Sequence, residues 1–106
     1  DAGTVVETEH KPTLADGVAG GVDGGSVTLP VARSGVDRVV YCSEDQIAAA
    51  VRTLALTENQ LVEGAAGLAL AGYNVIADEC KDQVNIVVLC GANYDRDVIL
   101  PLISEQ

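Results

Sequence analysis

The sequence contains no methionine, tryptophan or phenylalanine and a single histidine among its 106 residues. Asp1 stands where an initiator methionine would, so we expect the chain to be a piece or a processed product of a longer reading frame. The lone His10 lies in a polar stretch and supports no histidine-based catalytic dyad. No C-x-x-C or comparable spacing is present, so the sequence predicts no metal site.

Positive charge is also scarce, since six Lys and Arg face sixteen Asp and Glu and leave a net charge of −10. A chain this acidic repels polyphosphate, which argues against nucleic acid and anionic membrane surfaces as partners. The longest uncharged stretch, 64–77, is shorter than the roughly 20 apolar residues of a membrane span. We therefore expect neither kind of partner.

The three cysteines, Cys42, Cys80 and Cys90, are too few and too irregular for a disulfide framework. An odd number in a chain that is 48% hydrophobic favours free thiols in a reducing compartment. The sequence therefore predicts a cytoplasmic location.

The length and the apolar content predict one globular unit, with a change of composition near Ser26. Residues 1–25 form a polar, glycine-rich segment or loop, and residues 26–106 carry the regular elements. The glycines at 17–25 match neither G-x-G-x-x-G nor the phosphate-loop pattern, and Asp16 and Asp23 have the wrong charge for a phosphate. A linker or hinge is the preferred interpretation of this stretch.

Four helices are expected from local signals. The first spans 28–35 with Thr28 as its N-cap, and the second follows the capping box of Ser43 and Gln46 and runs to about residue 56. A buried helix, rich in small residues, is expected over 63–76, and a last one near 95–103 is weakened by Pro101. The second helix should bury an apolar face made of Ile47, Ala50, Val51 and Leu54.

β-branched and apolar runs at 38–41, 61–62 and 85–90 predict strands, the last of them covered on both faces. Strands that alternate with helices imply right-handed crossovers. The predicted fold class is therefore α/β, with a short, mostly parallel three-stranded sheet and flanking helices.

Ligands of open α/β sheets bind at the carboxyl ends of the strands, which directs attention to residues 63–67 and 90–93. Small residues at both places would let a ligand approach the backbone. The alternative, that these glycines serve turns and packing and that Cys90 is an inert core thiol, stays open. Lys11 and Lys81 lie in polar segments and do not resemble a buried Schiff-base lysine.

Four ordered segments resemble the last part of the catalytic domain of serine/threonine dehydratases, which are pyridoxal-phosphate (PLP) lyases of the tryptophan-synthase-β fold type, fold type II. They are KPTLADGVAGG at 11–21, VDRVVYCSEDQI at 36–47, VEGAAGLALAG at 62–72 and VLCGAN at 88–93. The resemblance extends from about residue 12 to the end. It implies that residues 26–106 are the C-terminal portion of such a catalytic domain.

The resemblance also implies which residues border the cofactor. Cys90 matches the Ser or Cys that faces the pyridine nitrogen, where a neutral group leaves the ring a milder electron sink. Glu63 matches the family's glutamate beside the ring. Gly17 matches a glycine of the family whose backbone lies near the cofactor. Gly91 and Asn93 would shape the wall behind the ring.

No stretch matches the family's Schiff-base lysine, its substrate-carboxylate loop, its phosphate loop or its metal ligands, all of which lie upstream. We therefore expect no catalytic residue in this chain and no PLP binding by the chain alone. The implied partners are the N-terminal remainder of the enzyme, a small amino-acid substrate and further copies in a homo-oligomer. The implied reaction is β-elimination of a hydroxy amino acid to a 2-oxo acid and ammonia.

Two other functions stay open. The chain could act as a stand-alone, non-catalytic binding or structural remnant of the fold, or it could belong to a racemase or threonine synthase of the same fold type.

Overall fold

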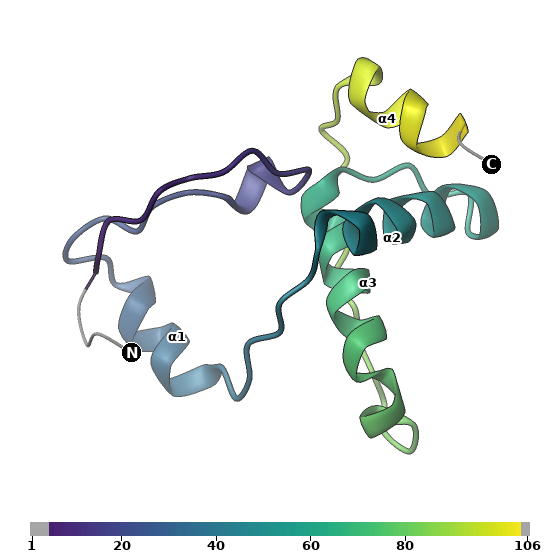
Figure 1. Ribbon diagram of the computed structural model, residues 1–106. Coiled ribbons are helices and arrows are strands. Elements are labelled where there is room, and N and C mark those ends of the chain that lie inside the picture. The colour runs from purple at the N-terminus through teal and green to yellow at the C-terminus, as the bar shows by residue number, and fades with distance from the viewer. Residues whose placement is uncertain (1–4, 105–106) are drawn as a thin grey trace.

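The computed structural model describes residues 5–104 and is helical throughout its regular parts. Helices α2, α3 and α4 gather into one body, whereas α1 lies apart from them (Figure 1). The elements in chain order are the short 3-10 helix η1 (Asp16–Val18), α1 (Thr28–Gly35), α2 (Glu44–Thr57), α3 (Gly64–Ile76), the 3-10 helix η2 (Ala77–Cys80) and α4 (Arg96–Ser104).

Helix α2 begins at the predicted capping box. Gln46 N–H donates to Ser43 Oγ at 3.2 Å, and Ser43 N–H donates to Gln46 Oε1 at 2.7 Å. At the other end Asn59 adopts a left-handed backbone with φ 54°, which stops the helix. The predicted apolar face is confirmed, since all four of its members are buried.

The capping box gives a first prediction. Ser43→Ala should lower the free energy of unfolding by about 1 kcal/mol, because an N-cap hydroxyl that satisfies a helical N–H contributes about that much. Ser34→Ala is the matched control, because the Ser34 hydroxyl donates only to the exposed Val31 carbonyl. Urea unfolding of the two variants measures the difference, and equal midpoints would contradict the role of the cap.

Helix α3 crosses α2 closely because its first turns lack side-chain bulk. Gly67 is buried, and a Cβ there would overlap Val51 Cγ2 and lie 3.4 Å from the Ile47 carbonyl oxygen. Ala66, which is fully buried, lies beside this crossing. The small residues that predicted a buried helix therefore serve helix-to-helix packing instead of packing on a sheet.

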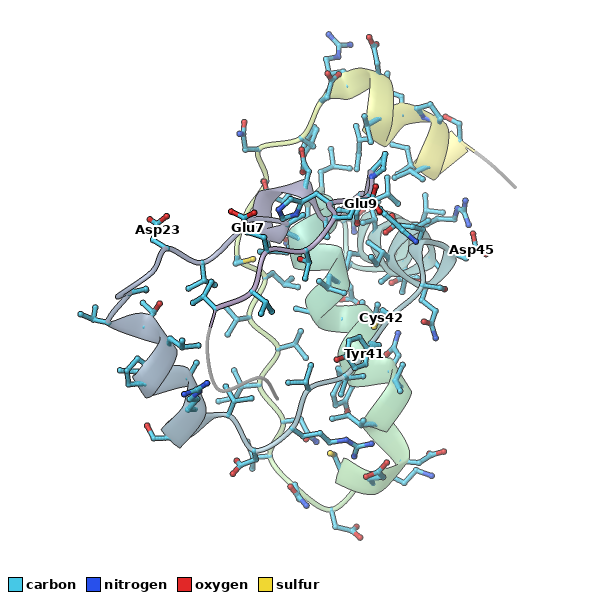
Figure 2. The ribbon with its side chains drawn as sticks, turned by 60° about the vertical axis from the view of Figure 1, so that its left-hand side comes forward. Glu7, Glu9, Asp23, Tyr41, Cys42 and Asp45 are labelled. Carbon is cyan, nitrogen blue, oxygen red and sulfur yellow. The ribbon has the colours of Figure 1, made fainter. Side chains whose placement is uncertain are left out.

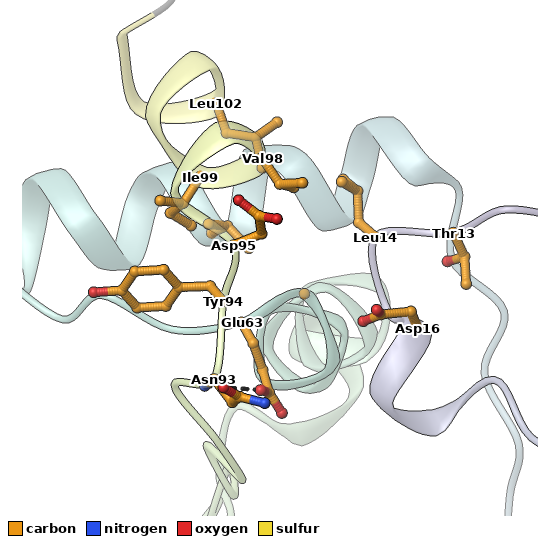
Figure 3. A pocket seen from close by; sticks show the side chains of 12 residues that line it. Thr13, Leu14, Asp16, Glu63, Asn93, Tyr94, Asp95, Val98, Ile99 and Leu102 are labelled. Atoms are coloured by element: carbon orange, nitrogen blue, oxygen red, sulfur yellow. Dashed lines mark hydrogen bonds between the residues drawn. The ribbon is translucent and has the colours of Figure 1, made fainter.

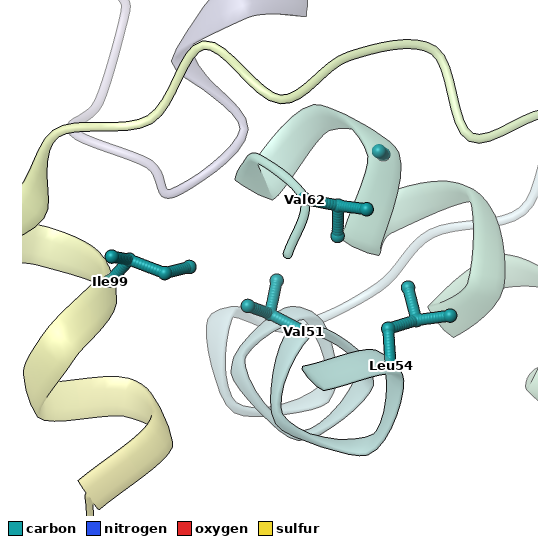
Figure 4. Close-up of a cluster of buried hydrophobic side chains, with 5 residues drawn as sticks. Val51, Leu54, Val62 and Ile99 are labelled. Atoms are coloured by element: carbon teal, nitrogen blue, oxygen red, sulfur yellow. The ribbon is translucent and has the colours of Figure 1, made fainter. Parts of the chain in front are cut away.

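The core consists of two small groups of side chains on either side of the α2–α3 crossing. Ala15, Ile47, Ala50 and Ala71 form one group. The other joins α2 and α3 to α4 through Val51, Leu54, Val62, Ala66 and Ile99 (Figure 4). Arg52 Nε also donates to the Leu102 carbonyl at 2.8 Å, so α4 is held by both apolar and polar contacts.

The predicted sheet is wrong: within residues 5–104 there is no strand. The runs at 38–41, 61–62 and 85–90 are non-helical, but they do not pair with one another in a backbone ladder, and an extended chain without a ladder is not a sheet. The run at 85–90 was expected to be covered on both faces, yet Ile86 is 84% exposed and Val88 67%. Within residues 5–104, these apolar side chains therefore stay largely uncovered.

The starts of two helices, α1 and α4, bear on the sequence-based predictions. Thr28 is the first residue of α1 and not its N-cap, which is Val27, and the Thr28 N–H donates to Ser26 Oγ at 3.3 Å. Helix α4 forms despite Pro101. The Asp95 carboxylate supports its first turn by accepting from the Asp97 N–H at 2.8 Å.

The chain is open for its size. Its radius of gyration is 15.2 Å, where a compact domain of this length has about 13 Å. Its accessible surface is 8050 Å², against about 5,600 Å² for a compact monomer of this mass. Tyr41, 89% exposed, is part of this uncovered surface (Figure 2).

One ion pair ties the segment before α2 to η2, which follows α3. Arg38 Nη1 donates to Glu79 Oε2 at 2.6 Å, and this hydrogen bond raises the pKa of the Arg38 guanidinium. Both side chains are more than half exposed, so the pair adds little stability. Within residues 5–104, no helix combines the length and apolar character needed to cross a bilayer.

Candidate functional site

Glu63 lies where the chain enters α3. Its backbone is extended, with φ −76° and ψ 166°, and it is the N-cap residue of the helix. Its side chain makes no capping hydrogen bond to α3, so the carboxylate is available to other segments. The neighbouring Val62 is 4% exposed in the core, which fixes the position of Glu63 relative to α2.

The Glu63 carboxylate organises the segment at 91–93. The Asn93 N–H donates to Glu63 Oε2 at 2.9 Å (Figure 3), and the Glu63 N–H donates to the Gly91 carbonyl at 3.2 Å. A Cβ on Gly91 would overlap the Glu63 carboxylate. Glycine at position 91 is therefore what allows the carboxylate to lie flat against this backbone.

Gly17 also lies near the Glu63 carboxylate. A Cβ on Gly17 would lie 3.6 Å from Glu63 Oε1 and 3.7 Å from Ala65 Cβ, both ordinary contact distances. The structure thus brings together four of the five predicted site residues, Gly17, Glu63, Gly91 and Asn93. Cys90 directly precedes Gly91 and is exposed, and in the described part of the chain it makes no hydrogen bond to Glu63.

A pocket of about 180 Å³ adjoins this cluster. It lies between η1, the start of α3 and α4 (Figure 3). Its apolar wall includes Val98, Ile99 and Leu102, and its polar wall includes Asp16, Glu63 and Asp95.

The size and charge of this pocket limit what it can bind. It is smaller than the roughly 300 to 1,000 Å³ of most ligand pockets. Three carboxylates line it and no Lys or Arg does, so it disfavours a phosphate. Within residues 5–104, no group of three His, Cys, Asp or Glu side chains could hold a metal ion.

A turn at Thr13–Ala15, which no motif of the sequence indicates, completes the site. The Thr13 hydroxyl donates to Glu44 Oε1 at 2.6 Å, and the Leu14 N–H donates to Glu44 Oε2 at 2.8 Å. A Cβ on Gly64 would overlap the Leu14 carbonyl. Gly64 therefore serves packing against another part of the chain. Packing is the alternative role that the sequence leaves open for the glycines at 63–67 and 90–93. No local pattern links residues this far apart in sequence.

Neither lysine lies at the Glu63 cluster. Lys81 pairs with Asp78 at 2.8 Å beyond the far end of α3, and both side chains are largely exposed. Lys11 is exposed and does not line the pocket beside Glu63. No amine of the described chain is therefore placed for Schiff-base chemistry at this cluster.

Comparison with known proteins agrees with the motifs. The family described as "Pyridoxal-phosphate dependent enzyme" matches residues 1–91. An L-threonine ammonia-lyase of Geobacter sulfurreducens is 36% identical over 97 residues, which are 92% of this chain and 24% of that protein. An L-threonine ammonia-lyase of Thermotoga maritima is 31% identical over 103 residues, which are 97% of this chain and 25% of that protein.

The chain thus spans about a quarter of the length of these two curated relatives. The family match covers the Glu63 cluster as far as Gly91, and both relatives match nearly the whole chain. The chain belongs to the family of pyridoxal-phosphate-dependent enzymes.

Proposed function

We propose that this chain forms one wall of the cofactor site of a PLP-dependent serine/threonine dehydratase. The observation that carries the proposal is the convergence of Gly17, Gly91 and Asn93 on the Glu63 carboxylate. With Glu63 itself, these residues come from three separate segments of the chain. The names of the relatives, which are L-threonine ammonia-lyases, support this reaction class.

The cluster suits one edge of a flat ring. Gly17 and Gly91 have no side chains to hold a ring away from the backbone, and Cys90 and Asn93 beside them are exposed. The surroundings do not suit the cofactor's phosphate, because the adjoining pocket is lined by carboxylates. Residues outside this chain would hold the phosphate and the aldehyde carbon.

When bound, PLP supplies the electron sink for β-elimination. The proposed role of Cys90 is to face the pyridine nitrogen, where a thiol in place of a carboxylate keeps that sink mild. Glu63 would hold the ring edge and fix the 91–93 backbone through the Asn93 N–H. None of these groups forms or breaks a substrate bond, so the chain supplies positioning and no catalytic residue.

The open surface indicates where the remainder of the enzyme would bind. Val84, Ile86 and Val88 are 94%, 84% and 67% exposed along one segment beside α3. Exposed apolar surface of this extent marks an interaction site. We propose that the upstream part of the catalytic domain covers this segment, with residues 26–106 as the domain's C-terminal portion and residues 1–25 as the segment that leads into it.

Two further assignments belong to this proposal. The whole enzyme would be a homo-oligomer that acts on a small hydroxy amino acid. The described cysteines are free, which suits a reducing cytoplasm.

The test uses the full-length protein that contains this chain, supplied with PLP and then with L-threonine or L-serine. We expect equal amounts of ammonia and of the 2-oxo acid, measured by coupled dehydrogenase assays. Release of neither product from either amino acid would contradict the proposed reaction.

Further assays on the same protein separate the other functions. A racemase would invert the amino acid without releasing ammonia, which chiral chromatography detects. A threonine synthase would form threonine from a phosphorylated homoserine. A non-catalytic remnant would show no turnover of any of these substrates and no retained PLP.

A further inference from the structure

The turn at Thr13–Ala15 is held by one side chain of α2. The Glu44 carboxylate accepts from the Thr13 hydroxyl at 2.6 Å and from the Leu14 N–H at 2.8 Å. The Thr13 oxygen in turn accepts from the Ala15 N–H at 3.1 Å. Three hydrogen bonds therefore fix three consecutive residues, and two of them end on Glu44.

This turn leads directly into the cofactor wall. Ala15 is 3% exposed and packs with Ile47 of α2. The Leu14 carbonyl fills the space that Gly64 leaves open at the start of α3. Two residues after Ala15, Gly17 lies against Glu63 Oε1. A displacement of the turn would therefore move Gly17 relative to the Glu63 carboxylate.

We propose that Glu44 is a positioning residue, which sets the Gly17 backbone against Glu63 and thereby shapes the cofactor wall. The inference rests on the proposed function, since it assumes that this wall borders PLP. Glu44 itself touches neither Glu63 nor Gly17 and acts only through the Thr13–Ala15 turn.

This role is separable from the role of Glu44 in its own helix. The N-terminus of α2 is capped reciprocally by Ser43 and Gln46, and Glu44 takes no part in that capping box. The next residue, Asp45, is an acid in the same first turn and is exposed. Its side chain makes no hydrogen bond or ion pair within residues 5–104. Asp45 therefore offers a matched control for loss of negative charge at the helix N-terminus.

The test compares Glu44→Gln with Asp45→Asn in the full-length protein. PLP is titrated into each apo protein and followed by fluorescence, and the midpoint of thermal unfolding is measured without PLP. The amide that replaces the Glu44 carboxylate can accept at only one of its two terminal atoms. We expect Glu44→Gln to weaken PLP binding about tenfold, because a hydrogen bond to a charged acceptor is lost. Asp45→Asn should leave PLP binding unchanged.

The thermal midpoints separate positioning from stability. Both variants lose one charge at the same helix end, so any fall in the Glu44→Gln midpoint beyond that of Asp45→Asn comes from the hydrogen bond to the turn that Glu44 alone of the two makes. PLP binding by Glu44→Gln equal to that of the wild type would overturn the inference while leaving the proposed function intact. A parallel loss of affinity and thermal stability in both variants would also overturn it, because that pattern indicates a general structural role.

Thr13 provides a second, independent route should Glu44→Gln fail to fold. Thr13→Val removes the hydroxyl that joins Glu44 to Ala15, whereas Thr13→Ser keeps it. We expect Thr13→Val to lose about as much PLP affinity as Glu44→Gln does. Thr13→Ser should bind PLP as the wild type does. Equal affinities of the two Thr13 variants would overturn the inference. Absence of PLP binding by the wild type would instead overturn the proposed function itself.

Discussion

Glu63→Ala should cause a large loss of PLP affinity. The carboxylate accepts from the Asn93 N–H at 2.9 Å and lies close to both Gly17 and Gly91. A hydrogen bond to a charged group contributes about 1.5–3 kcal/mol, which corresponds to about a 10- to 100-fold weaker affinity once it is removed. Fluorescence titration of the full-length apo protein with PLP measures this loss.

Two other substitutions make that result specific. Glu63→Gln retains an oxygen that can accept from the Asn93 N–H, so it should lose less affinity than Glu63→Ala. Glu58→Ala removes an exposed glutamate after the end of α2 that does not line the pocket beside Glu63, and the variant should bind PLP as the wild type does. Wild-type affinity in Glu63→Ala would contradict the assignment of Glu63 to the cofactor wall.

Gly64→Ala should have the second large effect, this time on stability. The added Cβ would overlap the Leu14 carbonyl carbon and oxygen and approach the Ala15 nitrogen at 3.0 Å. These are backbone atoms, which cannot rotate away as the end of a side chain can. Overpacking of this kind costs about 1–3 kcal/mol, and the small gain in helix propensity does not offset it.

Gly72→Ala in the same helix is the matched control. The nearest atom to a Cβ there is Cys42 Sγ at 4.0 Å, so the new methyl group fits. This substitution should stabilise the protein by about 0.5–1 kcal/mol, because alanine is the better helix former. Thermal unfolding should therefore shift in opposite directions for the two variants, and a shift in the same direction would contradict the packing described for Gly64.

The helices could be predicted because their signals are local. Ser43 and Gln46 are three residues apart, and the apolar face of α2 repeats at helical spacing. The sheet could not be predicted reliably, because a strand exists only through a partner. The apolar run at 85–90 indicates a surface that is normally covered, but it carries no information on which residues cover it. Within residues 5–104, no segment does so on both faces.

The site also contains residues that the sequence could predict and residues that it could not. Gly17, Glu63, Gly91 and Asn93 could be named from the sequence because they lie in motifs shared with a known family, and the structure brings them together. Their assignment to the cofactor stays a prediction. The contacts of Thr13 and Leu14 with Glu44 could not be foreseen, because they join positions 31 and 30 residues apart that carry no local signature.

We propose above all that the segment containing Cys90 and Gly91 faces the cofactor. Cys90 tests it most directly, because its thiol is exposed, whereas Cys42 and Cys80 are half-buried. The full-length protein is treated with a maleimide, with and without PLP, and the rate of labelling at each cysteine is read by peptide mass spectrometry. We predict that PLP protects Cys90 and leaves the rate at Cys80 unchanged. Equal labelling rates at Cys90 with and without PLP would contradict the account.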